Sequence, residues 1–224
     1  MMTNEADGQD PTPGLAELVR TATSREHQDT ENQSFMASLM GGELSLAHYV
    51  TYLAQYAYVY RALESRVVLP SDPAFLNDPA LARSHSIERD LAALGAPGWE
   101  STHPALPETA AYAARLVEVG QRDLPRYVAH HYTRYLGDMS GGQIIAKLLA
   151  RHYGATANQL SFYDFAEVPS TFRYKRGYRE NLDALPFDDA QVQALIAEAK
   201  AAFGYNGEIF DALGRRARTG VVPE

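Results

Sequence analysis

Residues Tyr127–Gly154 read YVAHHYTRYLGDMSGGQIIAKLLARHYG and carry the clearest structural signal in the chain. Apolar residues recur at helical spacing on both sides of a run of glycines, which predicts one long helix. Inside a helix, each of Gly137, Gly141 and Gly142 costs about 1 kcal/mol relative to alanine, and such violations tend to mark functional sites. Gly137 and Gly141 are one turn apart. A ligand could therefore reach the backbone where no Cβ stands, and the helix can bend there.

Three other interpretations of these glycines compete with a ligand site. Small residues four positions apart, such as Gly137 and Gly141, can allow two helices to pack closely, and this interpretation stays open. A contact between membrane helices is excluded, because Arg134, Asp138 and Lys147 lie in the same helix. Met139–Gln143 resembles the signature loop of ABC-type ATPases, but the chain has no Gly-Lys pair and therefore no phosphate-binding loop.

Length and composition limit the class of protein. The chain has 224 residues, of which 46% are hydrophobic and 21% charged, and this suits one globular domain. No apolar run approaches the ~18 residues of a membrane span. The absence of cysteine excludes disulfides and thiolate metal ligands, and no signal-peptide pattern is present, so we expect a cytoplasmic protein. A net charge of −8 argues against a nucleic-acid partner.

Helical periodicity and capping residues predict an all-α protein. We expect a disordered tail over 1–11, one domain over 12–214 and a C-terminal tail over 215–224. The helix expected over 46–69 is unusually rich in tyrosine, with Tyr49, Tyr52, Tyr56, Tyr58 and Tyr60. The other expected helices cover about 12–33, 79–94, 108–119, 123–153, 170–184 and 189–213, with a proline-rich loop at 99–107 and an aromatic linker at 154–168.

One histidine has a companion at helical spacing. His27 and Glu31 are four residues apart and share a helical face. A metal-bound imidazole commonly donates its second ring N–H to a carboxylate, which fixes the orientation of the ring. A surface contact would have the same spacing, so spacing alone leaves both interpretations open. The adjacent residues His130 and His131 point about 100° apart on a helix, and we expect them to be structural.

Residues Tyr135–Gln143, YLGDMSGGQ, closely resemble the distal-helix signature of the haem oxygenases, in the form carried by bacterial, diphtheria-type members. The run around His27, followed by Ser34-Phe35-Met36, is similar to the proximal helix of that family. The resemblance covers residues 14–214. It implies a single all-α domain in which haem lies between the proximal helix and a kinked, glycine-rich distal helix. His27 would bind the iron and Glu31 would orient the imidazole.

The resemblance also implies which residues hold the haem propionates. The family has a basic residue two turns before the proximal histidine, and Arg20 lies seven residues before His27. Lys175 and Arg179, within YKRGYR, resemble the second pair of anchors, and Tyr132 occupies the place of a contributing tyrosine. Without the resemblance, a solvated helix face would explain Lys175 and Arg179.

On the oxygen side, the resemblance implies that Gly137 and Gly141 press on the distal face of haem. Asp138 would act through ordered waters that deliver protons. Tyr60 matches a tyrosine of that water network, although core packing would explain it equally well. Arg134 could brace Asp138 from one turn away.

The implied activity is that of a haem oxygenase. Haem b would be both cofactor and substrate, and O₂ with electrons from a reductase or ferredoxin would cleave a meso bridge, giving biliverdin, carbon monoxide and ferrous iron. Two alternatives remain open from the residues: a haem carrier or sensor that does no chemistry, and an all-α interaction module that binds no haem.

Overall fold

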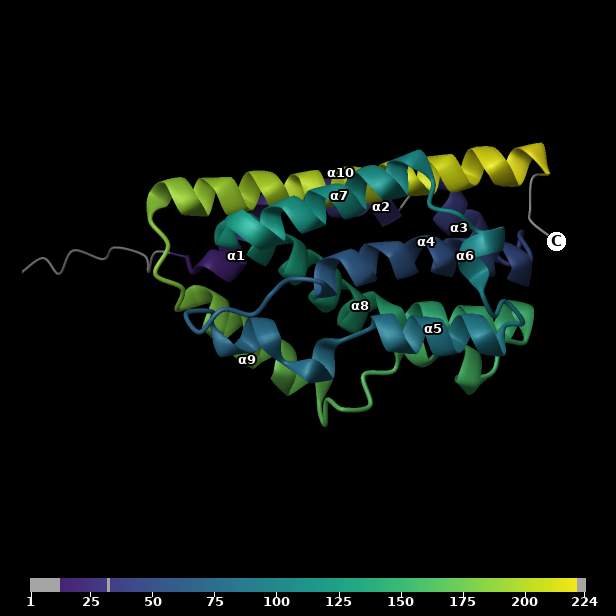
Figure 1. Cartoon of the computed structure of the whole chain (residues 1–224), viewed down its shortest axis with the longest axis horizontal. Helices are drawn as coiled ribbons and strands as arrows, with labels where there is room; N and C mark the ends of the chain where they lie inside the picture. Colours follow the sequence, from purple (N-terminus) through teal and green to yellow (C-terminus); the bar gives the residue numbers. More distant parts are fainter. Residues whose placement is uncertain (1–12, 32, 221–224) are drawn as a thin grey trace, which may run out of the picture.

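The computed structural model describes residues 13–31 and 33–220, and these residues form helices with no strand among them. Figure 1 shows the long helix α10 along one edge of the molecule, with α5 and α9 on the opposite side. The all-α expectation is therefore confirmed. The helices are α1 (Leu15–Ala22), α2 (Ser24–Glu31), α3 (Ser34–Gly41), α4 (Leu46–Glu64), η1 (Ala74–Asn77), η2 (Pro79–Leu81), α5 (Ser84–Ala93), α6 (Trp99–Thr102), α7 (Pro107–Arg122), α8 (Leu124–Tyr153), η3 (Ala157–Gln159), η4 (Ser161–Tyr163), α9 (Thr171–Asp183) and α10 (Asp189–Thr219).

The glycine run lies inside α8, one continuous helix of 30 residues. Asp123 caps its N-terminus by accepting from the Arg126 amide, and Gly154 ends it in the left-handed conformation. Pro125 occupies the first turn, where a missing N–H costs nothing. α8 packs along α10, and the two long helices form the frame on which the shorter ones assemble.

The tyrosine-rich helix α4 runs through the middle of the molecule and packs against α5, α7, α8 and α10. Tyr49, Tyr52, Tyr56 and Tyr60 are all buried on it. A helix that is apolar on most of its sides belongs in a core, and here the phenol rings supply much of the buried area.

Several boundaries differ from the sequence expectation. The helix expected over 12–33 is divided at Thr23, whose hydroxyl donates to the Val19 carbonyl and ends α1. The helix expected from 79 begins at Ser84, because Glu64 accepts from the amides of Arg83 and Ser84 there. The expected loop at 99–107 contains the short helix α6, and α10 continues to Thr219.

Candidate functional site

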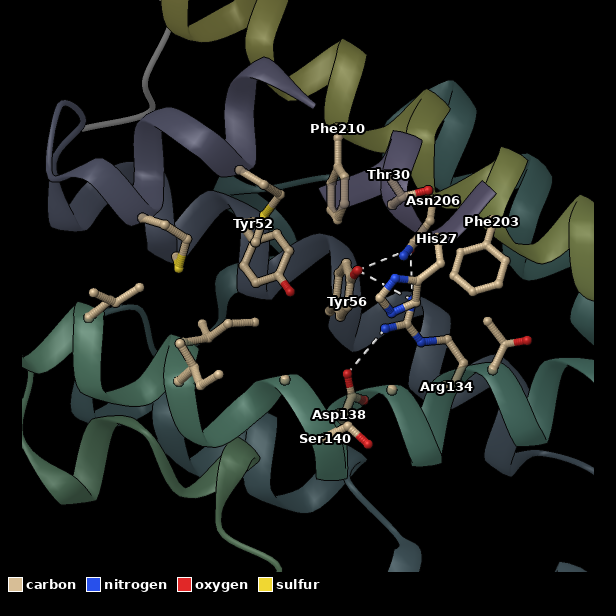
Figure 2. Close-up of a pocket in the computed structure, with 18 residues that line it drawn as sticks. His27, Thr30, Tyr52, Tyr56, Arg134, Asp138, Ser140, Phe203, Asn206 and Phe210 are labelled. Carbon is tan, nitrogen blue, oxygen red and sulfur yellow. Dashed lines mark hydrogen bonds and ion pairs between the residues drawn. The ribbon is translucent and has the colours of Figure 1, made fainter. Parts of the chain in front are cut away.

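A cavity of about 470 Å³ lies between α2 and α8 and is also lined by α3, α4 and α10 (Figure 2). Pockets of 300–1,000 Å³ are typical for cofactors and drug-sized ligands. Most of its wall is apolar or aromatic. The lining residues are His27, Thr30, Met36, Met40, Tyr52, Tyr56, Thr133, Arg134, Gly137, Asp138, Ser140, Gly141, Ile144, Ile145, Leu148, Phe203, Asn206 and Phe210.

His27 borders this cavity from α2. Its ring meets that of Phe203 on α10 edge-on, with 5.7 Å between ring centroids, and Figure 2 shows the two rings side by side. His27 is solvent-exposed and borders the cavity, so a ligand in the cavity would cover the ring. Glu31 is the last residue of α2, but its side chain lies outside the described part of the structure.

The three glycines of α8 serve different purposes. A Cβ on Gly137 or Gly141 would meet no described atom within 4 Å, and both residues line the cavity. A Cβ on Gly142 would lie 2.9 Å from the Tyr163 ring. Close helix packing therefore explains Gly142, whereas Gly137 and Gly141 leave bare backbone on the cavity wall.

Asp138 is held from two helices. Arg134, one turn earlier on α8, donates from Nη2 to Oδ1 at 3.2 Å. Tyr60 of α4 donates its hydroxyl to Oδ2 and is itself fully buried. Burial raises the pKa of the Asp138 carboxyl well above its ordinary value.

Arg134 connects the Asp138 carboxylate to Tyr56 of α4 and Asn206 of α10. Its Nη1 donates to Asn206 Oδ1 at 2.8 Å and to the Tyr56 hydroxyl at 3.3 Å, and the guanidinium lies over the Tyr56 ring at 4.8 Å. Figure 2 shows Arg134 between Asp138 on one side and Tyr56 and Asn206 on the other. Its buried Nε finds no acceptor among the described residues, which leaves one donor for a guest or a water.

One predicted propionate anchor, Lys175, contacts the cavity wall. Lys175 of α9 donates from Nζ to Ser140 Oγ at 3.1 Å, and Ser140 belongs to the cavity wall. Burial raises the pKa of Tyr132, and the charges of Arg179 and Arg20 oppose that shift. Arg20 is exposed and pairs with Glu17. The described lining of the cavity contains none of the four predicted anchors.

The two adjacent histidines of α8 are structural, as expected. His130 is fully buried, with Nε2 2.9 Å from Glu198 Oε1, and Glu198 also accepts from Arg115. His131 shares a hydrogen bond with the Tyr178 hydroxyl at 2.7 Å, and burial lowers its pKa to about 3.

The family model described as heme oxygenase matches residues 13–212 of the chain. The chain belongs to the haem oxygenase family. It is 34% identical to the heme oxygenase of Porphyra purpurea, with 89% of this chain and 86% of that protein covered. It is 32% identical to heme oxygenase 1 of Nostoc sp., with 89% and 85% covered. Haem oxygenase activity follows from relatives at this identity over most of the chain.

Solved haem oxygenases have the same fold. Heme oxygenase-1 of Synechocystis sp., crystallised in complex with heme, superposes with a TM-score of 0.86 at 29% identity, covering 93% of this chain and 96% of that one. The Leptospira interrogans enzyme gives 0.81 at 31% identity, covering 89% and 100%. No described helix is long and apolar enough to cross a membrane.

The residues of this haem oxygenase fit a haem. The cavity pairs one histidine with a wall of bare glycine backbone, its remaining surface is largely apolar, and the Lys175 ammonium contacts its wall at Ser140. A flat, hydrophobic macrocycle with two carboxylates needs these features.

Sequence reasoning missed part of the cavity wall. Phe203, Asn206 and Phe210 come from α10, and Tyr52 and Tyr56 from α4. The three α10 residues recur at helical spacing, which shows that they share a face. Spacing does not show that this face meets α8.

Proposed function

We propose that this haem oxygenase holds haem b in the cavity between α2 and α8, with His27 as the axial iron ligand. The observation that carries the proposal is the pairing within one cavity of an imidazole from α2 with the bare backbone of Gly137 and Gly141 from α8. Haem supplies both the iron that binds O₂ and the macrocycle that is cleaved at a meso bridge. The products would be biliverdin, carbon monoxide and ferrous iron.

Asp138, held by Arg134 and Tyr60, would deliver protons on the oxygen-binding side of the haem. Asp138 borders the cavity while Arg134 and Tyr60 hold its two carboxylate oxygens, so the side chain keeps one orientation. A carboxylate fixed in this way can order waters and pass protons through them to the reacting oxygen. Gly137 and Gly141, which carry no side chain, would leave room for dioxygen and for such waters at the cavity wall.

The peripheral residues would orient the haem. Lys175, Arg179 and Arg20 would offer positive charge to the propionates, and Tyr132 would contribute its hydroxyl. Glu31 would accept from the second ring nitrogen of His27. Electrons would come from a separate reductase or ferredoxin. We propose the cytoplasm as the compartment, since a chain without cysteine has no disulfide that would need an oxidising one.

Hemin titration followed by reduction in air tests the proposal. Added hemin is expected to give a Soret band, which decays to a biliverdin spectrum when ascorbate or a ferredoxin system supplies electrons. Catalase is included so that free peroxide cannot cause the decay. A Soret band that persists would indicate a carrier or sensor, and no Soret band would refute haem binding.

A further inference from the structure

A second cavity lies against α9, away from the cavity between α2 and α8. Its volume is about 180 Å³, and the two cavities share no lining residue. Pockets for drug-sized molecules measure about 300–1,000 Å³, so the second cavity suits a smaller ligand. The described residues that line it are Phe75, Asp78, Tyr174, Gly177, Tyr178 and Asn181.

Gly177 gives the second cavity part of its space. It lies in the middle of α9, where glycine lowers helix stability relative to alanine. A Cβ at this position would meet no described atom within 4 Å, and the backbone has no positive φ there. Neither close packing nor backbone conformation therefore requires glycine at this position. Its bare backbone leaves room for a ligand in the second cavity.

Three aromatic side chains form most of the remaining wall of the second cavity. The Phe75 and Tyr178 rings meet edge-on, with 4.9 Å between ring centroids and 86° between ring planes. Tyr174 lies one turn before Tyr178 on α9. The face of an aromatic ring carries partial negative charge and attracts cations, and ammonium groups are commonly recognised by surrounding aromatic rings. The aromatic wall therefore favours a cation over an anion.

Asp78 adds a carboxylate to the same wall. Its Oδ2 accepts from the Tyr174 hydroxyl at 2.6 Å and its Oδ1 accepts from the Ala80 amide at 2.9 Å, so both oxygens are held in place. A carboxylate has about four acceptor positions, and these two bonds leave others for a ligand. No basic side chain belongs to the described lining of the second cavity. The half-buried carboxylate is therefore available to a cation from outside the protein.

We propose that the second cavity binds a small organic ammonium ion, with Asp78 pairing with its charge and the aromatic rings packing against its alkyl groups. Hard metal ions do not suit this lining, because Ca²⁺ and Mg²⁺ take about six or more oxygen ligands and the lining supplies one carboxylate. An anion would be repelled by Asp78. The proposal concerns a site separate from the haem cavity and does not depend on haem binding.

Titration of the full-length, haem-free protein with tetramethylammonium chloride tests the proposal. Backbone amide shifts are followed by nitrogen–proton correlation NMR, with sodium chloride at the same concentrations as the control for ionic strength. We expect saturable shifts at Gly177 and Tyr178, with a dissociation constant in the millimolar range. The neutral molecule tert-butanol has a similar size and shape, and it should bind at least about tenfold more weakly because it lacks the charge.

Two variants test the assigned roles. Asp78→Asn removes the charge and keeps the size of the side chain, and it should weaken tetramethylammonium binding about fivefold or more. Gly177→Ala places a methyl group in the second cavity and should weaken binding to a similar extent. Alanine also favours the helix, so this variant should unfold at a higher temperature, and its loss of binding would not come from unfolding.

Asp211→Asn and Gly204→Ala are the matched controls, because both residues are exposed on α10 and line neither cavity. Both controls should bind like wild type. The proposal is overturned by the absence of a saturable shift with tetramethylammonium, by equal binding of tert-butanol, or by an unchanged dissociation constant in Asp78→Asn. None of these outcomes bears on haem binding, which hemin titration measures separately.

Discussion

Arg134 and Asp138 meet one turn apart on α8, with the guanidinium Nη2 3.2 Å from carboxylate Oδ1. Tyr60 reaches the other carboxylate oxygen from α4. The Asp138 side chain keeps 11% of its surface exposed, on the helix whose glycines line the cavity. We expect a carboxylate restrained in this way to transfer protons to a bound ligand and to contribute little to the affinity for that ligand.

Asp138→Ala is therefore expected to bind hemin about as tightly as wild type but to form biliverdin at least about 10²-fold more slowly, the usual scale for a lost proton-transfer group. Hemin titration and biliverdin formation are measured on the same sample. Asp138→Asn keeps the shape and should be equally slow. Biliverdin formation at the wild-type rate in either variant would mean that proton delivery follows another route.

His27→Ala should lose ordinary axial ligation, because His27 is the histidine on the cavity wall. Added imidazole should restore the ferric spectrum by occupying the space left by the side chain. His152→Ala is a suitable control, since His152 lies near the C-terminus of α8. If the spectrum of His27→Ala matches wild type without imidazole, a different residue binds the iron.

Removing the cationic anchors should change the site of cleavage before it abolishes binding. Exposed charge contacts are worth about 0–1 kcal/mol each, whereas burying the macrocycle contributes about 25 cal/mol per Å² of apolar surface. Lys175→Ala/Arg179→Ala should give a mixture of biliverdin isomers by chromatography. Arg173→Ala/Arg176→Ala removes two charges from the same helix and is the control. A single wild-type isomer from the first variant would exclude these residues as anchors.

The glycines of α8 should respond in opposite ways to alanine. Gly142→Ala places a Cβ 2.9 Å from the Tyr163 ring and should destabilise the protein by about 1–3 kcal/mol through overpacking. Gly137→Ala meets open space and should stabilise the haem-free protein by up to about 1 kcal/mol, while weakening hemin binding. Chemical denaturation and hemin titration measure the two effects. Equal stability changes in both variants would contradict the division of roles.

Protonation of Glu198 should contribute to the loss of stability at low pH. Burial raises the pKa of this carboxyl, but hydrogen bonds from Arg115 and His130 outweigh burial and lower it to about 2. A lowered folded pKa stabilises the native state above the ordinary value of 4.5, and this contribution disappears as pH falls toward about 2. Glu198→Gln should therefore lose stability at neutral pH and show a flatter stability profile between those limits. The free energy of unfolding is measured by chemical denaturation at each pH. If its pH dependence in Glu198→Gln matches wild type, another group causes the acid sensitivity.

Local patterns in the sequence were sufficient for the helices and for several site residues. The 3.6-residue periodicity and the caps predict an all-α chain, because helix formation depends on neighbours within four residues. The Arg134–Asp138 contact was predicted for the same reason, since it spans one turn. The structural roles of His130 and His131 also followed from helix geometry. The break at Thr23 was missed, because a single hydroxyl bonding back to Val19 leaves no mark on the apolar pattern.

The tertiary structure decided which groups from different helices meet at the cavity wall and behind it. Tyr60 and Asp138 are 78 residues apart, and Arg134 and Asn206 are 72 apart. No local spacing encodes such contacts, because they depend on how α4, α8 and α10 pack. The same packing distinguishes Gly142, which meets Tyr163, from Gly137, which faces the cavity. Spacing places Gly137 and Gly141 on one face, but only the position of the neighbouring helices shows that Gly142 is a packing contact.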